Sequence, residues 1–481
     1  MPLNLSRFVG LMSYLYGWMK TTLRRIHPWM TAALEGRIQN NRTIASLDGV
    51  RAIACLTVIG YHISLITRDT HLWSPTAPGI LHHIFSSIVL AGASGVTLFF
   101  VLSGFLLFMP FCKAMLFETK WPSTITFYLR RAFRILPGYY VVLLSILLIS
   151  HPAYLHVNHW QDLTLFFTLF MDATPGTFQQ INGPFWTLAV EWQFYLLLPL
   201  LMIAFSLLVL RIPRRWRVYA LVACLSGVVA WGIWSRTWGA YYTANAMQTF
   251  LVPRPIYNVF LFFTYGVGGK YLEDFAIGML VSLIYMYVTQ ASFPGKFATV
   301  LCRLSPLYFI AGLSVLMMMA LWLYNVRYFN SWPLFDRLST PLYNDISEAC
   351  LAGGFGLCII AILLGPRWLR RPFEWSPLRW IGLTSYSLYM VHLPLLILFM
   401  VNVGYHMQGM NRSVGISLYI IWTLCVIFPI SFLSFLLVEK PWVELGNKLL
   451  KKEKQAAKQD GDSHQERVIE DRATERELVK W

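Results

Sequence analysis

The feature that most constrains this chain is a series of apolar stretches, each long enough or nearly long enough to cross a bilayer as a helix. A hydrocarbon core about 30 Å thick is crossed by about 20 residues at about 1.5 Å per residue. A backbone inside lipid must satisfy its own hydrogen bonds, so these stretches predict helices. Ten are present: residues 52–68, 87–109, 136–152, 187–210, 218–235, 271–289, 304–324, 346–364, 378–402 and 414–438.

The composition agrees with a fold that lies mainly in lipid. Hydrophobic residues make up 57% of the 481 residues and charged residues only 13%, which favours an all-α integral membrane protein with a bundle of about ten transmembrane helices. The net charge of +16 is typical of basic residues beside anionic membrane lipids. No basic groove motif accompanies it, so we expect no nucleic-acid partner.

The distribution of Lys and Arg predicts the orientation. Ten spans put both termini on one side, and most of the 39 Lys and Arg residues fall on that side, whereas the long connection 153–186 has none. We therefore expect both termini to be cytoplasmic. The apolar segments 163–171 and 257–269 are too short to span easily, and we interpret them as re-entrant or interfacial pieces.

Three regions follow from these patterns. Residues 1–44 are predicted to be a basic, amphipathic cytoplasmic extension with an interfacial helix. Residues 45–445 form the membrane domain, and residues 446–481 are a charged cytoplasmic tail. The helical spacing in the first region is carried by Phe8, Met12, Leu15, Met19 and Leu23.

Ionisable side chains within spans are costly and point to function. His62 is predicted to lie past the midplane toward the outside, and Glu191, which enters from the outside, stops at about the same depth. A carboxylate that orients an imidazole makes a general base, although a structural His–Glu hydrogen bond explains the same spacing. His392 is a third such residue.

Basic residues gather at the cytoplasmic side of the third stretch. Arg131 and Arg134 lie three residues apart, on one helix face, and follow Arg130. Guanidinium groups bind phosphates in bidentate fashion, but ordinary positive-inside placement is the alternative. Asp48 is predicted to cap the first spanning helix. Arg51 fits either an interfacial anchor or a ligand contact.

A metal site has little support in the sequence. His151, His156 and His159 precede Asp162, yet their spacing follows no familiar zinc pattern. The seven cysteines include no CxxC pair and are interpreted as small buried hydrophobic residues. We expect no bound metal and no permanently bound cofactor.

Six segments together resemble a known family, the acyltransferase 3 family of integral membrane acyltransferases. These segments occur in the family's order, and the resemblance covers about residues 44–445. They are "SLDGVRAIACLTVIGYH" (46–62), "GVTLFFVLSGFLL" (95–107), "RRAFRILPGYY" (130–140), "GPFWTLAVEWQFYLLLPLL" (183–201), "SYSLYMVHLPLL" (385–396) and "VEKPW" (438–442).

The resemblance implies transfer of an acyl group, often acetyl, from acyl-CoA at the cytoplasmic face to a hydroxyl of a carbohydrate or related acceptor used outside the cell. The family's arginine and histidine, with ten residues between them, correspond to Arg51 and His62. Its RxxR motif corresponds to Arg131 and Arg134, and its glutamate to Glu191. A bacterial plasma membrane is the expected location.

Several alternatives remain open at this stage. A covalent acyl-His62 intermediate competes with direct transfer. Ser103 or Gly104 could serve as an oxyanion donor, although such residues in spans more often serve helix packing. Trp186 and His392 are expected to support or line the cavity. The rival class is a proton-coupled transporter or polysaccharide exporter, whose relay would be His62 and Glu191. A catalytically inactive receptor or scaffold is disfavoured by the intact motifs.

Overall fold

The computed structural model describes residues 42–290, 295–329, 335, 340–407 and 409–450. The regular elements in these ranges are all helical. Within these ranges, ten helices are long and apolar enough to cross a membrane, which agrees with the predicted number of spans. Their bounds are Ala45–Asp69, Ile80–Phe117, Thr124–Ile149, Phe185–Val209, Arg214–Ala244, Leu272–Gln290, Ser305–Tyr328, Thr340–Leu364, Ser385–Asn402 and Arg412–Leu450.

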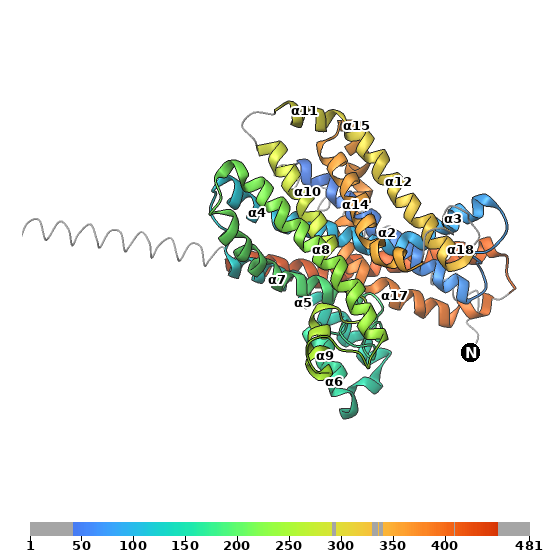
Figure 1. The fold of residues 1–481 in the computed structure, drawn as a ribbon. Coiled ribbons are helices and arrows are strands. Elements are labelled where there is room, and N and C mark those ends of the chain that lie inside the picture. Colours follow the sequence, from blue (N-terminus) through green and yellow to red (C-terminus); the bar gives the residue numbers. More distant parts are fainter. Residues whose placement is uncertain (1–41, 291–294, 330–334, 336–339, 408, 451–481) are drawn as a thin grey trace, which may run out of the picture.

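Figure 1 shows these helices packed into one bundle. Its main elements are α2 (Arg42–Asp69), α3 (Ile80–Leu90), α4 (Gly95–Phe117), α5 (Thr124–Ile149), α7 (Phe185–Val209), α8 (Arg217–Ala244), α10 (Leu272–Gln290), α12 (Ser305–Tyr324), α14 (Thr340–Leu364), α16 (Ser376–Leu383), α17 (Ser385–Asn402), α18 (Arg412–Trp422) and α19 (Phe428–Ser434).

Small residues bring α4 and α10 into close contact. A Cβ added at Gly104 would lie 2.1 Å from the carbonyl oxygen of Phe275, and one added at Gly278 would lie 2.1 Å from that of Val101. Such reciprocal glycines let two membrane helices approach closely enough for their backbones to touch. Gly104 therefore serves helix packing.

The third span begins earlier than the expected 136–152. Ser123 caps α5, because its side-chain oxygen accepts a hydrogen bond from the backbone N–H of Thr126 at 3.3 Å. Arg131 and Arg134 thus lie well inside the helix, where they face the bundle. Their charge hid this part of the span from a search for apolar runs.

The first span also begins earlier, which corrects the role of Asp48. Since α2 starts at Arg42, Asp48 lies inside the helix and does not cap it. Its carboxylate is 3.6 Å from the guanidinium of Arg379 on α16, and both side chains are buried. A Cβ on Gly382 would lie 1.8 Å from the Asp48 carbonyl oxygen, so the two helices touch at this ion pair.

The two short apolar segments form helices that are too short to span. These are α6 (Trp160–Thr168) and α9 (Arg254–Thr264). They lie together at one end of the bundle in Figure 1. The rings of Phe170 and Phe262 stack with centroids 5.8 Å apart, which joins the two segments.

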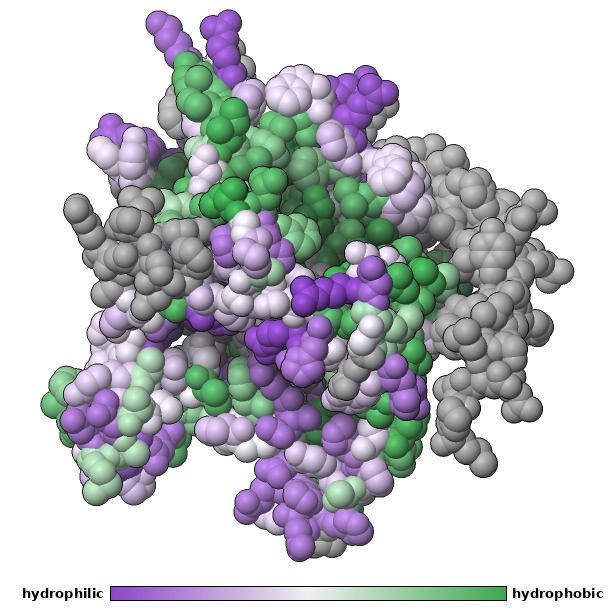
Figure 2. Space-filling model, turned by 90° about the vertical axis from the view of Figure 1, so that its right-hand side faces the viewer, coloured by the Kyte–Doolittle hydropathy of each residue, from purple (hydrophilic) through white to green (hydrophobic). Residues whose placement is uncertain are grey.

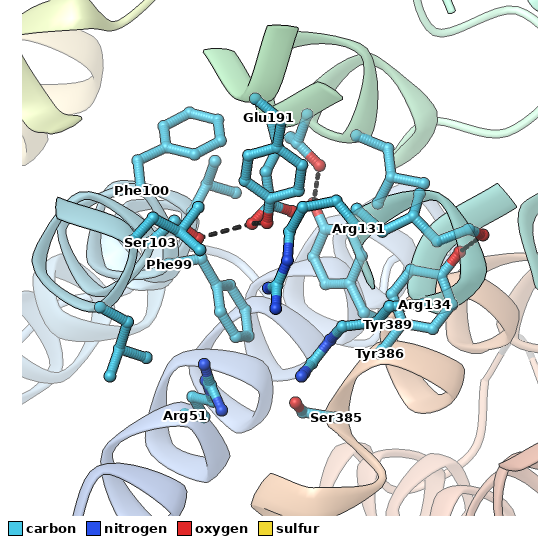
Figure 3. A pocket seen from close by; sticks show the side chains of 17 residues that line it. Arg51, Phe99, Phe100, Ser103, Arg131, Arg134, Glu191, Ser385, Tyr386 and Tyr389 are labelled. Carbon is cyan, nitrogen blue, oxygen red and sulfur yellow. Dashed lines mark hydrogen bonds between the residues drawn. The ribbon is translucent and has the colours of Figure 1, made fainter. Parts of the chain in front are cut away.

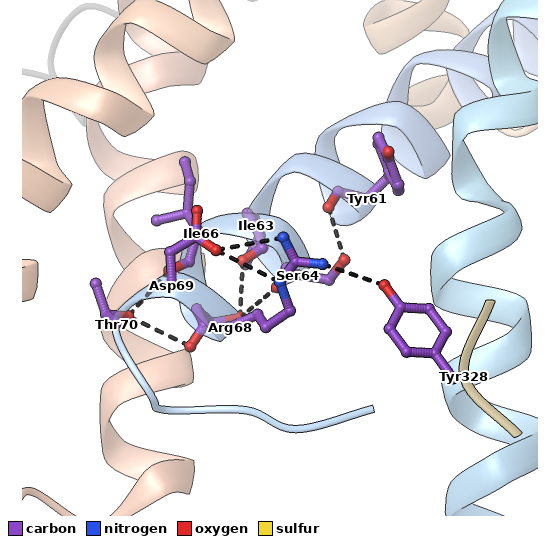
Figure 4. A network of polar contacts seen from close by, with 9 residues as sticks. Tyr61, Ile63, Ser64, Ile66, Arg68, Asp69, Thr70 and Tyr328 are labelled. Atoms are coloured by element: carbon purple, nitrogen blue, oxygen red, sulfur yellow. Dashed lines mark hydrogen bonds and ion pairs between the residues drawn. The ribbon is translucent and has the colours of Figure 1, made fainter. Parts of the chain in front are cut away.

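The C-terminal end of α2 is held by polar contacts, shown in Figure 4. Arg68 donates a hydrogen bond to the hydroxyl of Tyr328 at 3.1 Å and lies 3.3 Å from Asp69.

Figure 2 shows the face on which α3 and α18 lie in Figure 1. Hydrophilic side chains gather in its lower part, and apolar ones lie above them.

The two predicted terminal regions fall mostly beyond the structural description. Residues 42–44 belong to α2, and the amphipathic helix expected before them lies outside the described residues. At the other end, the last candidate span runs to Leu450, and the rest of the charged tail also lies outside them.

Candidate active site

A cavity of about 280 Å³ lies between α2, α4, α5, α7 and α17. The structure brings Arg51, Arg131 and Arg134 together in it, although they come from two helices (Figure 3). Ser103 and Glu191 line the same cavity. We call it the arginine cavity. The expectation that these arginines share a site matches their position.

The arginine cavity carries an excess of positive charge. In the described part of the chain, no ion pair joins Arg51, Arg131 or Arg134 to a carboxylate. Glu191 instead accepts hydrogen bonds from Ser103 Oγ at 2.5 Å and from the Tyr195 hydroxyl. Partly buried cations without a counterion favour an anionic ligand.

A second cavity, of about 870 Å³, lies beside the C-terminal half of α2. His62 lines it, and so do aromatic, amide and charged side chains; we call it the histidine cavity. Trp186, expected to support the site, lies here with its ring 5.4 Å from that of Tyr271. Other polar lining residues are Asp69, His151, Gln179, Gln180, Asn182, Arg236, Arg327, Asn344, Ser347 and Glu348.

The ring partner of His62 differs from the expected one. Nε2 of His392 lies 3.1 Å from Nδ1 of His62, and the ring centroids are 5.0 Å apart. Glu191 lines the other cavity, and the described residues show no hydrogen bond between it and His62. His392 is fully buried behind His62 and is not a lining residue of either cavity. The predicted His62–Glu191 contact is therefore wrong.

The two cavities meet at three residues. Val96, Thr187 and Tyr389 line both. The Thr187 hydroxyl donates to the Pro184 carbonyl at 2.8 Å. Its single proton is then used, so the Tyr389 hydroxyl donates to Thr187 Oγ1, also at 2.8 Å. This hydrogen bond lies at the boundary between the cavities.

Neither residue of that hydrogen bond was singled out from the sequence. The only signal was their position within two of the family-like segments, 183–201 and 385–396. The histidines near the long connection 153–186 have different surroundings. His151 lines the histidine cavity, whereas Nδ1 of His159 lies 3.3 Å from the carboxylate of Asp162.

The described residues thus form a helical bundle of the multi-pass membrane class, with a cationic cavity and a separate cavity lined by His62. The family model of the acyltransferase domain matches residues 44–437, so the chain belongs to the acyltransferase 3 family. This match favours an enzyme over a transporter.

Curated relatives carry names that agree with this family. The chain is 24% identical over 383 residues to a peptidoglycan O-acetyltransferase of Listeria monocytogenes, covering 75% of this chain and 50% of the relative. It is 24% identical over 438 residues to a putative O-acetyltransferase of Staphylococcus aureus, covering 85% and 59%. A putative peptidoglycan O-acetyltransferase of Bacillus subtilis is 24% identical over 377 residues, covering 75% and 50%.

The chain thus spans about half to three fifths of the length of these relatives. No solved structure matches it significantly.

Proposed function

We propose that this protein moves an acyl group, acetyl in the first instance, from acyl-CoA to a hydroxyl of a carbohydrate acceptor. The observation that carries the proposal is the pair of cavities that meet at Thr187 and Tyr389. One holds unpaired arginines, and the other holds His62 among side chains suited to a sugar.

The arginine cavity supports a donor with phosphate groups. Arg51, Arg131 and Arg134 can form charge-assisted hydrogen bonds to the phosphates of CoA. The cavity is too small for a whole CoA molecule, so the nucleotide would stay at its mouth. The acyl-bearing arm would extend past the Thr187–Tyr389 hydrogen bond toward His62.

The histidine cavity supports a carbohydrate acceptor. Trp186, Tyr271 and Tyr343 offer aromatic surfaces to the apolar face of a sugar ring, and the amides of Gln179 and Asn344 offer donors and acceptors to its hydroxyls. The names of the relatives include peptidoglycan as a substrate, which makes peptidoglycan fragments the first acceptors to try.

In the proposed reaction His62 is the general base. Its unprotonated ring nitrogen takes the proton of the acceptor hydroxyl as the oxygen attacks the thioester carbonyl. The C–S bond then breaks, the ester forms, and the imidazolium returns its proton to the CoA thiolate. Base catalysis of this kind contributes about 10²- to 10⁴-fold in rate.

We further propose that the protein lies in the bacterial plasma membrane with both termini in the cytoplasm. The excess of Lys and Arg on one side of the ten spans supports this orientation. Donor and acceptor would then enter from opposite faces, since Arg51 lies nearer the N-terminal end of α2 than His62 does.

The test is CoA release from acetyl-CoA by membranes that contain the protein and soluble peptidoglycan fragments. We expect His62→Ala to abolish the release at matched expression. His406→Ala is the matched control, because His406 is exposed and lines neither cavity. Equal release from wild type and His62→Ala would reject His62 as the base.

A further inference from the structure

We propose that His392 is a positioning residue that fixes the ring proton of His62 on Nδ1 and so leaves Nε2 free to act as the base. The expected effects on kcat rest on the proposed function, in which His62 is the base. The arrangement itself follows from two hydrogen bonds, which can be tested without any activity.

The first hydrogen bond fixes the tautomer of His392. Its Nδ1 lies 2.8 Å from the backbone oxygen of Tyr389. A carbonyl oxygen only accepts hydrogen bonds, so Nδ1 of His392 must carry a proton. A neutral imidazole has one N–H, and Nε2 of His392 is therefore an acceptor.

The second hydrogen bond determines which ring nitrogen of His62 carries the proton. Since Nε2 of His392 accepts, Nδ1 of His62 must donate across their 3.1 Å separation. The proton of neutral His62 is thus on Nδ1, and its Nε2 carries a lone pair. The two bonds form a chain from His62 through His392 to the Tyr389 carbonyl.

The opposite assignment is strongly disfavoured. If Nδ1 of His62 accepted, His392 would have to donate from both ring nitrogens and carry a positive charge. His392 is fully buried, and its described polar contacts are the backbone of Tyr389 and Leu388 and the ring of His62, none of which is a carboxylate. An uncompensated buried cation is far more costly than a neutral ring.

The same hydrogen bonds also stabilise His62 after proton transfer. When His62 becomes an imidazolium, its Nδ1–H still donates to His392, and a hydrogen bond from a charged donor is stronger than one from a neutral donor. His392 thus takes the orienting role that sequence reasoning gave to Glu191, with a neutral acceptor in place of a carboxylate.

The kinetic test compares two substitutions at one position. His392→Leu removes the acceptor, and we expect kcat to fall about 10- to 100-fold, the range known for groups that orient metal-bound histidines, with the KM for acyl-CoA unchanged. His392→Gln keeps an acceptor near the position of Nε2, and we expect it to recover most of kcat. His406→Leu is the control for histidine loss.

Two kinetic results would overturn the proposal. The first is a kcat for His392→Leu within twofold of wild type. The second is a kcat for His392→Gln as low as that of His392→Leu, which would assign His392 to packing alone. If His62→Ala keeps full activity, the proposed function fails instead, so the two failures are distinguishable.

A spectroscopic test applies even to a preparation without activity. In protein with ¹⁵N-labelled imidazole rings, the His62 signals among the 11 histidines are identified by their absence in His62→Gln. We expect wild-type His62 to show an unprotonated Nε2, and His392→Leu to shift the population toward protonated Nε2. A protonated Nε2 in wild type at neutral pH would refute the inference.

Discussion

The arginine cavity combines Arg51 with two arginines, Arg131 and Arg134, that lie about eighty residues later in the sequence. Spacing alone could place Arg131 and Arg134 on one face of a helix, because that depends only on helical geometry. It could not show that Arg51 joins them, since this depends on how α2 and α5 are placed around the cavity. The family resemblance named all three, and the packing explains why they line one cavity.

The partner of His62 was harder to predict for a related reason. Depth in the membrane can be estimated from the ends of a span, and His62 and Glu191 are predicted at similar depths. Depth says nothing about which helix faces which. The contact that forms joins His62 to a histidine 330 residues away, which only the three-dimensional arrangement reveals.

At the residue scale we predict that Arg134→Gln raises the KM for acyl-CoA about tenfold or more, because a hydrogen bond to a charged group is worth about 1.5 to 3 kcal/mol. We expect a smaller change in kcat. Arg130→Gln is the control, since Arg130 is exposed and does not line the cavity. Equal KM values for Arg134→Gln and wild type would count against a phosphate site.

At the scale of elements, the number of spans was predictable because apolar length can be read from any sequence. The residues at which the helices begin could not be predicted in the same way. Asp48, Arg131 and Arg134 interrupt the apolar pattern, yet they lie within helices because the bundle supplies an ion pair or a polar cavity for them. The predicted span boundaries are therefore wrong where charged residues lie inside a helix.

The crossing of α4 and α10 gives a prediction for stability. Gly104→Ala would place a methyl group against the Phe275 carbonyl, and we expect it to lower the free energy of unfolding by about 1 to 3 kcal/mol, as overpacking does. Gly227→Ala on α8 is the control, because nothing lies within 4 Å of its added Cβ. Denaturation of the two purified variants in detergent provides the comparison, and equal stability would show that the helices can separate without cost.

At the scale of the whole molecule, the two cavities predict a difference in access. A membrane-impermeant thiol reagent applied to intact cells should label Leu65→Cys, in the histidine cavity, but not Leu106→Cys, in the arginine cavity. In inverted vesicles the result should be reversed. The parent protein, with its seven cysteines, sets the background.

Adding Tyr389→Ala to Leu106→Cys removes the hydrogen bond at the boundary, and we expect external labelling to appear. External labelling of Leu106→Cys without that change would mean that the boundary is open. Labelling of Leu65→Cys from the cytoplasmic side alone would reverse the proposed orientation.

The position of Arg51 and His62 on one unbroken helix has a consequence for the choice of donor. His62 lies eleven residues after Arg51, so the two positions are about 16 Å apart along α2 at about 1.5 Å per residue. In the proposed reaction, a donor anchored by its phosphates at Arg51 carries its acyl group on an arm of comparable length. Acetyl phosphate could bind the arginines, but its acetyl group would stop far short of His62.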